Sequence, residues 1–193
     1  MTDALHECVT NTDPNSNVNV YSNRYCKPWK LSDDGVSFIV VWESGTLNGK
    51  YAGRDVVEGF ILTAYLDNVG IPTVGWGHRI LPADKIKVGD SITLERAREF
   101  KKKAINEVEN KINGVLKVPL FQLEYDALCS IIYNCGIGDG ANEILKKLNT
   151  GDHIHGDVFN YVSTYRVGNN KDVKHRRFAE ARLFETGVYD ASH

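Results

Sequence analysis

The stretch Glu58–His78, EGFILTAYLDNVGIPTVGWGH, decides the fold predicted for this chain. Its alternating apolar residues indicate a β-strand flanked by two carboxylates, Glu58 and Asp67. The Gly-Ile-Pro sequence at 70–72 favours a turn, since glycine tolerates a positive φ and proline fixes its own φ. The pattern therefore predicts a β-hairpin. The carboxylates and the Thr73 hydroxyl indicate one wall of a cleft, and a plain surface hairpin is the equally weighted alternative.

Length and composition predict a single globular domain. The chain has 193 residues, of which 23 are basic and 25 acidic, so its formal net charge is −2. A nearly neutral chain argues against nucleic acid as the main partner. No apolar run approaches the roughly 20 residues that a membrane span needs. The first seven residues also lack the features of a cleavable secretory signal. We therefore expect synthesis in the cytoplasm, no membrane partner, and release by another route.

The segments before the hairpin differ in character. Residues 1–30 are rich in Asn, Ser and Asp without any period, which predicts an irregular N-terminal arm. Ser32 can cap a helix over 32–43 that ends at Glu43. Residues 44–57 are polar and contain three glycines, so they are predicted to form a loop.

The chain after the hairpin is predicted to be helical. Apolar residues recur there at helical spacing, and turn residues separate the runs. The expected helices cover about 93–113, 118–136, 142–148, 157–165 and 173–185. The fold class is therefore α+β and mainly α.

The sequence predicts neither a metal nor a cofactor. The four cysteines have no metal-ligand spacing, although Cys8 and Cys26 bracket a polar segment and could pair in an oxidising compartment. His153 and His155 are spaced for two ligands on a strand, but they lie in a predicted loop with no third ligand nearby.

Carboxylates at a hairpin and at a helix end fit the cleavage of a glycosidic bond. That reaction needs one protonated carboxyl to donate to the leaving oxygen. It also needs an ionised carboxylate that positions water or acts as the nucleophile. The motifs of other hydrolases and of P-loop enzymes are absent from the sequence. For His78, which ends the hairpin motif, we expect a structural hydrogen bond in preference to catalysis.

These residues resemble the phage-type lysozymes, or endolysins, of glycoside hydrolase family 24. The pattern Glu-Gly, Tyr-x-Asp, Gly-x-x-Thr-x-Gly-x-Gly-His runs without a gap from Glu58 to His78. The resemblance covers about residues 31–190. Its further matches are Ser32, Gly35, Glu43, Val118–Leu120, Gln122, Tyr125–Ser130, Asn134, Gly136, Arg176, Arg177, Glu180, Leu183, Phe184, Thr186 and Gly187.

The resemblance implies a two-lobed, lysozyme-like domain over 31–193, which follows the arm of residues 1–30. A small hairpin lobe and a helical lobe would be joined by a long helix, with the opening helix counted in the helical lobe. The expected parts are the hairpin lobe at about 44–92, the interlobe helix at about 93–113, and the helical lobe at about 114–190 together with 32–43.

The resemblance also implies a muramidase that acts on bacterial peptidoglycan. Such enzymes hydrolyse the β-1,4 bond between N-acetylmuramic acid and N-acetylglucosamine. In the family a Glu is the general acid, and an Asp and a Thr, matched here by Asp67 and Thr73, hold the attacking water. His78 and Asn134 are expected to support the site. Arg176 matches an arginine that faces the catalytic Glu across the cleft, and a helix-surface charge is its alternative role.

The usual single glutamate of the family corresponds to two residues here. Glu43 has the helix position, eight residues after Gly35, and Glu58 has the hairpin spacing, nine residues before Asp67. A helix packed on the core holds an acid more rigidly than a loop exit does, which slightly favours Glu43. The unbroken motif favours Glu58. Both are candidates for the general acid, and the insertion 44–57 separates them.

Other functions fit the same residues less well. A lysozyme-like domain could bind glycan strands without cutting them, in a delivery or structural assembly, but the presence of both Asp67 and Thr73 argues against that. Hydrolysis of a related glycan such as chitin is a third hypothesis. Phage lysis and delivery into the periplasm as an antibacterial toxin effector both suit the chain, and the split motif mildly favours the effector. An effector implies an immunity protein or delivery machinery as partner, and a monomer is expected.

Overall fold

The computed structural model of the chain describes residues 7–10, 20–25, 27–150 and 158–192, with side chains from residue 27 onward. The predicted pairing of Cys8 with Cys26 lies outside the described residues, because Cys26 and the side chain of Cys8 are not among them. The same is true of the pair His153 and His155.

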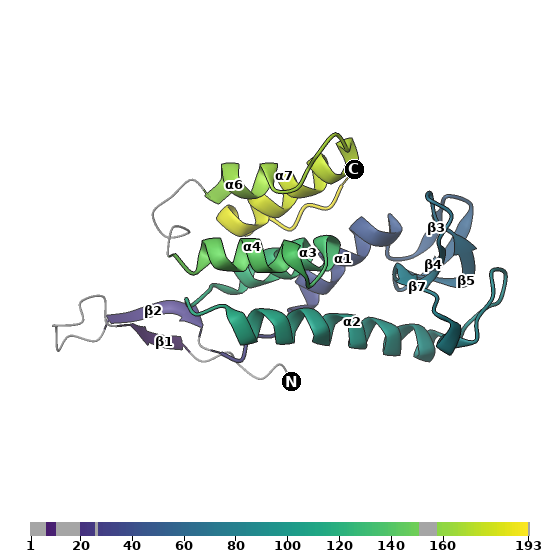
Figure 1. The fold of residues 1–193 in the computed structure, drawn as a ribbon, viewed down its shortest axis with the longest axis horizontal. Helices are drawn as coiled ribbons and strands as arrows, with labels where there is room; N and C mark the ends of the chain where they lie inside the picture. The colour runs from purple at the N-terminus through teal and green to yellow at the C-terminus, as the bar shows by residue number, and fades with distance from the viewer. Residues whose placement is uncertain (1–6, 11–19, 26, 151–157, 193) are drawn as a thin grey trace. The chain divides into compact units, whose positions relative to one another are not determined.

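The fold is α+β and mainly helical, as predicted (Figure 1). Its helices are α1 (Asp33–Ser44), α2 (Leu94–Val115), α3 (Gln122–Cys135), α4 (Asp139–Leu148), α6 (Val158–Thr164) and α7 (Lys171–Thr186), with the short 3-10 helix η1 (Pro82–Asp84). One antiparallel sheet has the strand order β3 (Gly49–Tyr51), β4 (Arg54–Val57), β5 (Phe60–Leu66), β6 (Pro72–Gly75), β7 (His78–Arg79). None of the helices in the described ranges has the length and apolar character needed to cross a bilayer.

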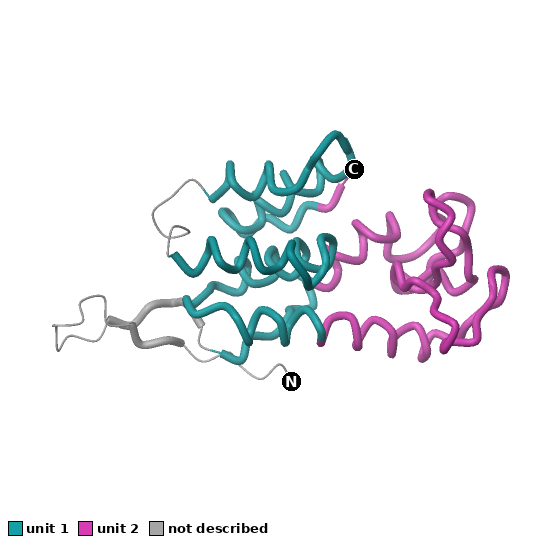
Figure 2. Tube along the Cα trace, in the orientation of Figure 1, with its two compact units in different colours: residues 1–35, 107–190 teal, residues 36–106, 191–193 magenta. Residues whose placement is uncertain are grey.

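The described residues form two compact units (Figure 2). The helical unit comprises residues 1–35 and 107–190, and the strand unit comprises residues 36–106 and 191–193. From Val36 onward α1 therefore belongs with the strands, whereas we had expected the opening helix to be part of the helical lobe. The reason is a close contact, since Val40 of α1 packs directly on Gly59 in the turn before β5.

Helix ends follow local signals where those are strong. Thr93 Oγ1 accepts a hydrogen bond from Arg96 N at 3.2 Å and caps α2 as predicted. Gly187, in the left-handed region at φ 73°, ends α7. α3 starts later than predicted, at Gln122, because the Glu124 carboxylate accepts from Phe121 N at 2.7 Å and caps the helix there. Every residue of α3 from 124 to 132 is buried, as expected for a core helix.

The N-terminal arm is not wholly irregular, and that prediction was wrong in part. β1 (Glu7–Thr10) and β2 (Val20–Tyr25) pair as a two-stranded antiparallel sheet. Their sequences, ECVT and VYSNRY, lack the apolar alternation that indicates a strand. The end of the arm is anchored by Trp29, which is 1% exposed and lies 5.8 Å, between ring centroids, from Tyr125 of α3.

The insertion between α1 and the motif is a β-hairpin, so the predicted loop over 44–57 was also wrong. β3 and β4 pair with Tyr51 opposite Arg54. The two residues between them, Ala52 and Gly53, have φ 48° and 77°, as a type I′ turn requires. Ala-Gly lacks the Asn-Gly signature of such turns, and β3 is exposed along its length. Neither the turn nor an apolar alternation therefore marked this hairpin in the sequence.

The contact between Gly59 and α1 leads to a stability prediction. Gly59 has φ 80°, and a Cβ added there would lie 1.9 Å from Val40 Cγ1. Replacing Gly59 with Ala combines an unfavourable φ with overpacking, so we expect the free energy of unfolding to fall by roughly 2–4 kcal/mol. Chemical denaturation of the purified variant measures the change.

Gly53→Ala is the matched control for this prediction. Gly53 has a similar φ of 77°, but a Cβ there would meet nothing within 4 Å. It should lose only about 1 kcal/mol through backbone strain. Equal losses in the two variants would contradict the packing of Gly59 on Val40.

Candidate active site

The bend of the β5–β6 hairpin holds Asp67 in a fixed orientation. Asp67 Oδ1 accepts hydrogen bonds from Val69 N at 2.9 Å and Ile71 N at 2.8 Å. An aspartate that binds backbone N–H groups two and four residues later stabilises a turn. Asp67 Oδ2 has no hydrogen-bond partner among the described residues. The turn therefore immobilises the carboxylate through one oxygen and leaves the other as an acceptor.

Thr73 lies on β6 close to this bend. It is only 5% exposed, and its Oγ1 donates to Ile71 O at 3.0 Å. Because the hydroxyl hydrogen is used in that bond, the oxygen lone pairs are left to accept a hydrogen bond from another molecule. In the sheet register Thr73 pairs with Tyr65 of β5.

Tyr65 on β5 is the strand partner of Thr73 and lies two residues before Asp67. It is the Tyr of the Tyr-x-Asp motif, but no role was predicted for it. Burial has the largest influence on this half-buried tyrosine and raises its pKa. The charges of Asp67 and Glu43 raise the pKa further, so both carboxylates lie within electrostatic reach of the tyrosine hydroxyl. Its place in the Tyr-x-Asp motif, two residues before Asp67, is a signal in the sequence that could have found it.

Glu43 reaches this place from α1. It occupies the last turn of the helix and is half-buried. Its Oε2 lies beside the turn between β6 and β7, where a Cβ added to Gly77 would be 3.2 Å from it. Gly77 has φ 72° and carries no side chain, which lets the carboxylate approach the turn. Glu43, Asp67 and Thr73 all belong to the strand unit, with Glu43 beside the turn that follows β6 and Asp67 at the bend that precedes it.

Glu58 has a different environment. It and Gly59 are the two residues between β4 and β5, with φ 51° and 80°, so the Glu-Gly of the motif is a tight turn. The side chain is half-exposed and forms a bidentate ion pair with Arg98 of α2, at 2.7 and 2.8 Å from Nη2. The hydrogen bond from Arg98 to Glu58 raises the pKa of the guanidinium. An ion pair of this kind needs the ionised carboxylate, whereas a general acid must carry a proton.

His78 makes contacts that hold the strand unit together. Its Nε2 lies 2.9 Å from Asp84 Oδ2, and its ring stacks on Phe100 with centroids 4.0 Å apart. Burial of Asp84 raises the pKa of its carboxyl, but hydrogen bonds from Leu81 N and His78 outweigh this, and the net pKa is lowered. His78 therefore links β7 to η1 and α2.

Arg176 and Asn134 lie in the helical unit and belong to one polar network. Arg176 is 5% exposed, so the alternative of a helix-surface charge was wrong. Its Nε donates to Glu180 Oε1 at 3.0 Å. Asn134 Oδ1 accepts from Arg177 Nη2 at 2.7 Å, and Arg177 in turn binds Glu180. The predicted roles of Arg176 and Asn134 toward substrate stay predictions.

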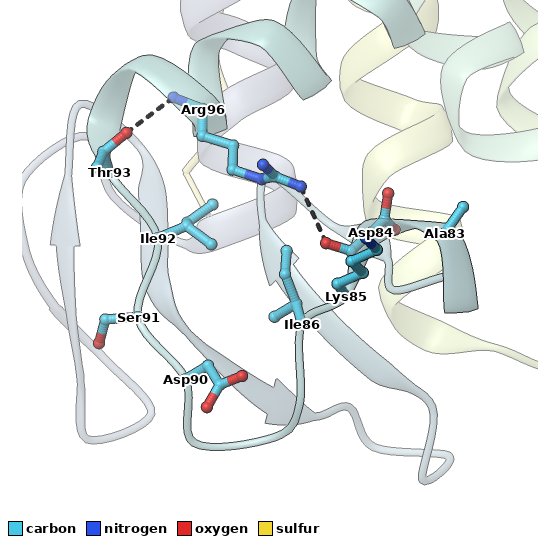
Figure 3. Close-up of a pocket in the computed structure, with 9 residues that line it drawn as sticks. All are labelled: Ala83, Asp84, Lys85, Ile86, Asp90, Ser91, Ile92, Thr93 and Arg96. Atoms are coloured by element: carbon cyan, nitrogen blue, oxygen red, sulfur yellow. Dashed lines mark hydrogen bonds between the residues drawn. The ribbon is translucent and has the colours of Figure 1, made fainter.

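Other features of the described residues do not add to the site. No group of three or more His, Cys, Asp or Glu side chains is placed to hold a metal ion in the part of the chain that the structure describes. A polar pocket of about 740 Å³ is lined by residues 83–86, 90–93 and Arg96 at the start of α2 (Figure 3). It contains none of the residues that the sequence predicted for catalysis.

A mainly helical fold with a small antiparallel sheet, together with the Glu, Asp and Thr of the hairpin motif, is typical of a lysozyme-type glycoside hydrolase. The phage lysozyme family matches residues 55–180. The endolysin of Salmonella phage P22 is 42% identical over 131 residues, which cover 66% of this chain and 88% of that protein. The endolysin of Acyrthosiphon pisum secondary endosymbiont phage 1 is 36% identical over 135 residues, which cover 67% and 90%. This chain belongs to the phage lysozyme family.

A solved structure supports the same assignment. The endolysin from Escherichia coli O157:H7 phage FAHEc1 has a TM-score of 0.65 and 28% identity, over 84% of this chain and 97% of that one. The predicted resemblance, fold class and muramidase activity are thus confirmed, and nothing favours a domain that binds glycan without cutting it. The family match includes Glu58, Asp67 and Thr73, whereas Glu43 precedes its first residue.

Proposed function

We propose that Glu43, Asp67 and Thr73 are the catalytic residues with which this muramidase cleaves peptidoglycan. The observation that carries the proposal is the position of the three residues along β6. Thr73 lies on this strand, Asp67 binds Ile71 N at the bend before it, and Glu43 Oε2 lies beside Gly77 in the turn after it. The charges of both carboxylates also raise the pKa of Tyr65, the strand partner of Thr73. Glycoside hydrolysis needs such a pair of carboxylates in different roles.

Glu43 is the general acid in this proposal. It protonates the glycosidic oxygen while the bond from that oxygen to C1 of N-acetylmuramic acid breaks. A rigid helix end suits this role, since a catalytic acid must be held in place to within a fraction of an ångström. Glu58 instead holds a turn to α2 through its ion pair with Arg98.

Asp67 and Thr73 position the attacking water. One hydrogen of the water binds Asp67 Oδ2 and the other binds Thr73 Oγ1, which leaves an oxygen lone pair directed at C1. Asp67 accepts a proton as the new bond forms, and exchange with solvent then restores both carboxyl groups. A single displacement by water inverts the configuration of C1.

Replacing Asp67 with Asn tests the water-positioning role. Asn keeps an Oδ1 that accepts from Val69 N and Ile71 N, so the turn should persist while the charge and the second acceptor are lost. We expect turnover on purified sacculi to fall about 10²-fold. Reducing-end analysis of the wild-type products should show N-acetylmuramic acid at the new ends.

Asp55→Asn is the control, because Asp55 is an exposed aspartate of the insertion paired with Lys50 at 3.2 Å. It should retain the wild-type rate. Full activity of Asp67→Asn would refute the role of Asp67. New ends that carry N-acetylglucosamine, or equal cleavage of chitin, would refute the proposed bond specificity.

The biological setting proposed for the chain is phage lysis, because relatives at 42% and 36% identity are named endolysins. Its target is then the cell wall of the host, reached from the periplasm. The toxin effector setting, with an immunity protein and delivery machinery, stays a prediction, as does the monomeric state. A holin gene beside the coding gene would support lysis, and an adjacent immunity gene would support the effector.

A further inference from the structure

The insertion hairpin is firmly anchored at its base. Gly59 N donates to Leu47 O at 2.5 Å, and Glu58 N donates to Asn48 Oδ1 at 3.0 Å. The hairpin also extends the sheet, since β4 pairs with β5. Its two strands are therefore held in register with the strand that carries Tyr65 and leads to Asp67.

One face of this hairpin contacts Gly45 and Tyr65. Tyr51 and Arg54 are cross-strand partners, so their side chains share a face, and the paired Lys50 and Asp55 lie on the opposite face. The Tyr51 ring packs on the backbone of Gly45, where an added Cβ would lie 2.1 Å from Cδ2. Gly45 is two residues beyond Glu43 in the chain.

Arg54 is the cation on that face. Its guanidinium carbon lies 4.3 Å from the centroid of the Tyr65 ring, and the positive charge lowers the pKa of Tyr65, against the larger effect of burial. The charges of Glu43 and Asp67 act on the pKa of the same tyrosine and raise it. The insertion thus brings a positive charge onto Tyr65, which pairs with Thr73 and lies two residues before Asp67.

The Arg54 guanidinium is held in place by its stacking on Tyr65, but most of its N–H donors make no hydrogen bond within the described residues. It makes one long hydrogen bond, from Nη1 to Ala52 O at 3.4 Å. Within the part of the chain that the structure describes, Arg54 forms no ion pair. An arginine stacked on an aromatic ring keeps its planar set of N–H donors available, and that set matches a carboxylate. Because stacking already orders the side chain, binding such a group requires little further loss of freedom.

We propose that Arg54 binds a carboxylate of the peptidoglycan strand and positions the strand at the active site. This inference rests on the proposed function. The carboxylate has two possible sources in peptidoglycan. The stem peptides carry carboxylates, and the lactyl group of N-acetylmuramic acid carries one wherever its peptide has been removed. The insertion hairpin is therefore a substrate-binding element that the chain adds to the lysozyme site.

The test compares steady-state kinetics on two soluble substrates, peptidoglycan strands with stem peptides and the same strands after amidase treatment. For Arg54→Gln we expect KM to rise about tenfold on at least one of them, with kcat within about twofold of wild type. A rise on peptide-bearing strands alone identifies stem-peptide carboxylates, and a rise on stripped strands alone identifies the lactyl carboxylate. Arg54→Lys should recover part of the loss, because it keeps the charge without the planar donors.

Lys50→Gln is the matched control, since it removes the same charge from the opposite face of the same hairpin. It should leave KM unchanged on both substrates. The inference is overturned if Arg54→Gln has the wild-type KM on both, if it matches Lys50→Gln, or if only kcat falls. A wild-type protein that cleaves neither substrate would instead refute the proposed function, so the two failures are distinguishable.

Discussion

Glu43→Gln is expected to lower turnover on purified peptidoglycan about 10³-fold, within the range that general acid catalysis supplies. Gln has nearly the same shape as Glu, but its amide has no acidic proton that could be transferred to the leaving oxygen. The side chain lies at the end of α1, beside the turn at Gly77. Release of reducing ends from purified sacculi measures the loss over three orders of magnitude.

The melting temperature and KM of Glu43→Gln distinguish a loss of catalysis from a loss of folding or of substrate binding. Glu43→Gln should have the wild-type melting temperature, because the replacement removes no packing from α1. Its KM on soluble strands should change by less than about threefold, since the acid acts on the transition state more than on binding. A variant that melts early, or that loses affinity and keeps kcat, would contradict the role of Glu43 as the acid.

The second large effect is expected in the helical unit, at Glu180. This carboxylate is 0% exposed and accepts hydrogen bonds from Arg176 Nε at 3.0 Å and Ser130 Oγ at 2.6 Å, and from Arg177 Nη1. Glu180→Gln leaves two buried guanidinium groups without their counter-charge. Breaking a buried pair in this way costs about 3–5 kcal/mol. For a chain of this size, that lowers the melting temperature by roughly 10 °C.

Glu143→Gln provides the comparison for Glu180→Gln. Glu143 also binds an arginine, Arg166 at 3.0 Å, but its side chain is 56% exposed. Exposed pairs contribute about 0–1 kcal/mol, so this variant should melt within about 3 °C of wild type. Thermal unfolding followed by circular dichroism measures both. Similar melting temperatures for the two variants would mean that the network around Glu180 does not stabilise the helical unit.

Local signals in the sequence were enough to predict the elements that carry the site. The β5–β6 hairpin follows from the alternation of β5 and from the Gly-Ile-Pro turn, and Asp67 reinforces that turn through its own neighbours, Val69 and Ile71. The cap of α2 at Thr93 is likewise local. These features depend on residues only a few positions apart, so they can be predicted from the sequence.

The insertion shows where pattern reasoning failed. Hairpins are recognised by their turn residues and by one buried face, but Ala52-Gly53 is an uncommon turn pair and all three residues of β3 are exposed. Residues 49–57 form strands because β3 pairs with β4 and β4 pairs with β5 of the sheet. The contribution of the insertion to the site, through Arg54 and Tyr65, depends on that pairing and was equally invisible.

The choice between the two glutamates also depended on contacts between distant residues. Glu58 and Arg98 are 40 residues apart, so the motif gives no indication of their ion pair. Arg176 and Glu180 are four residues apart, and their pairing was visible in principle, but not their burial. The residue types follow from the sequence, whereas the different surroundings of Glu43 and Glu58 appear only in the fold.

The central claim is that Glu43 is the acid and Glu58 is not. Initial rates of Glu43→Gln and Glu58→Gln on one preparation of purified sacculi test it most directly. We expect Glu58→Gln to stay within about threefold of wild type, since an exposed ion pair contributes little. Glu43→Gln should be at least about 10²-fold slower than Glu58→Gln. A slower Glu58→Gln, or wild-type rates for both variants, would contradict the account.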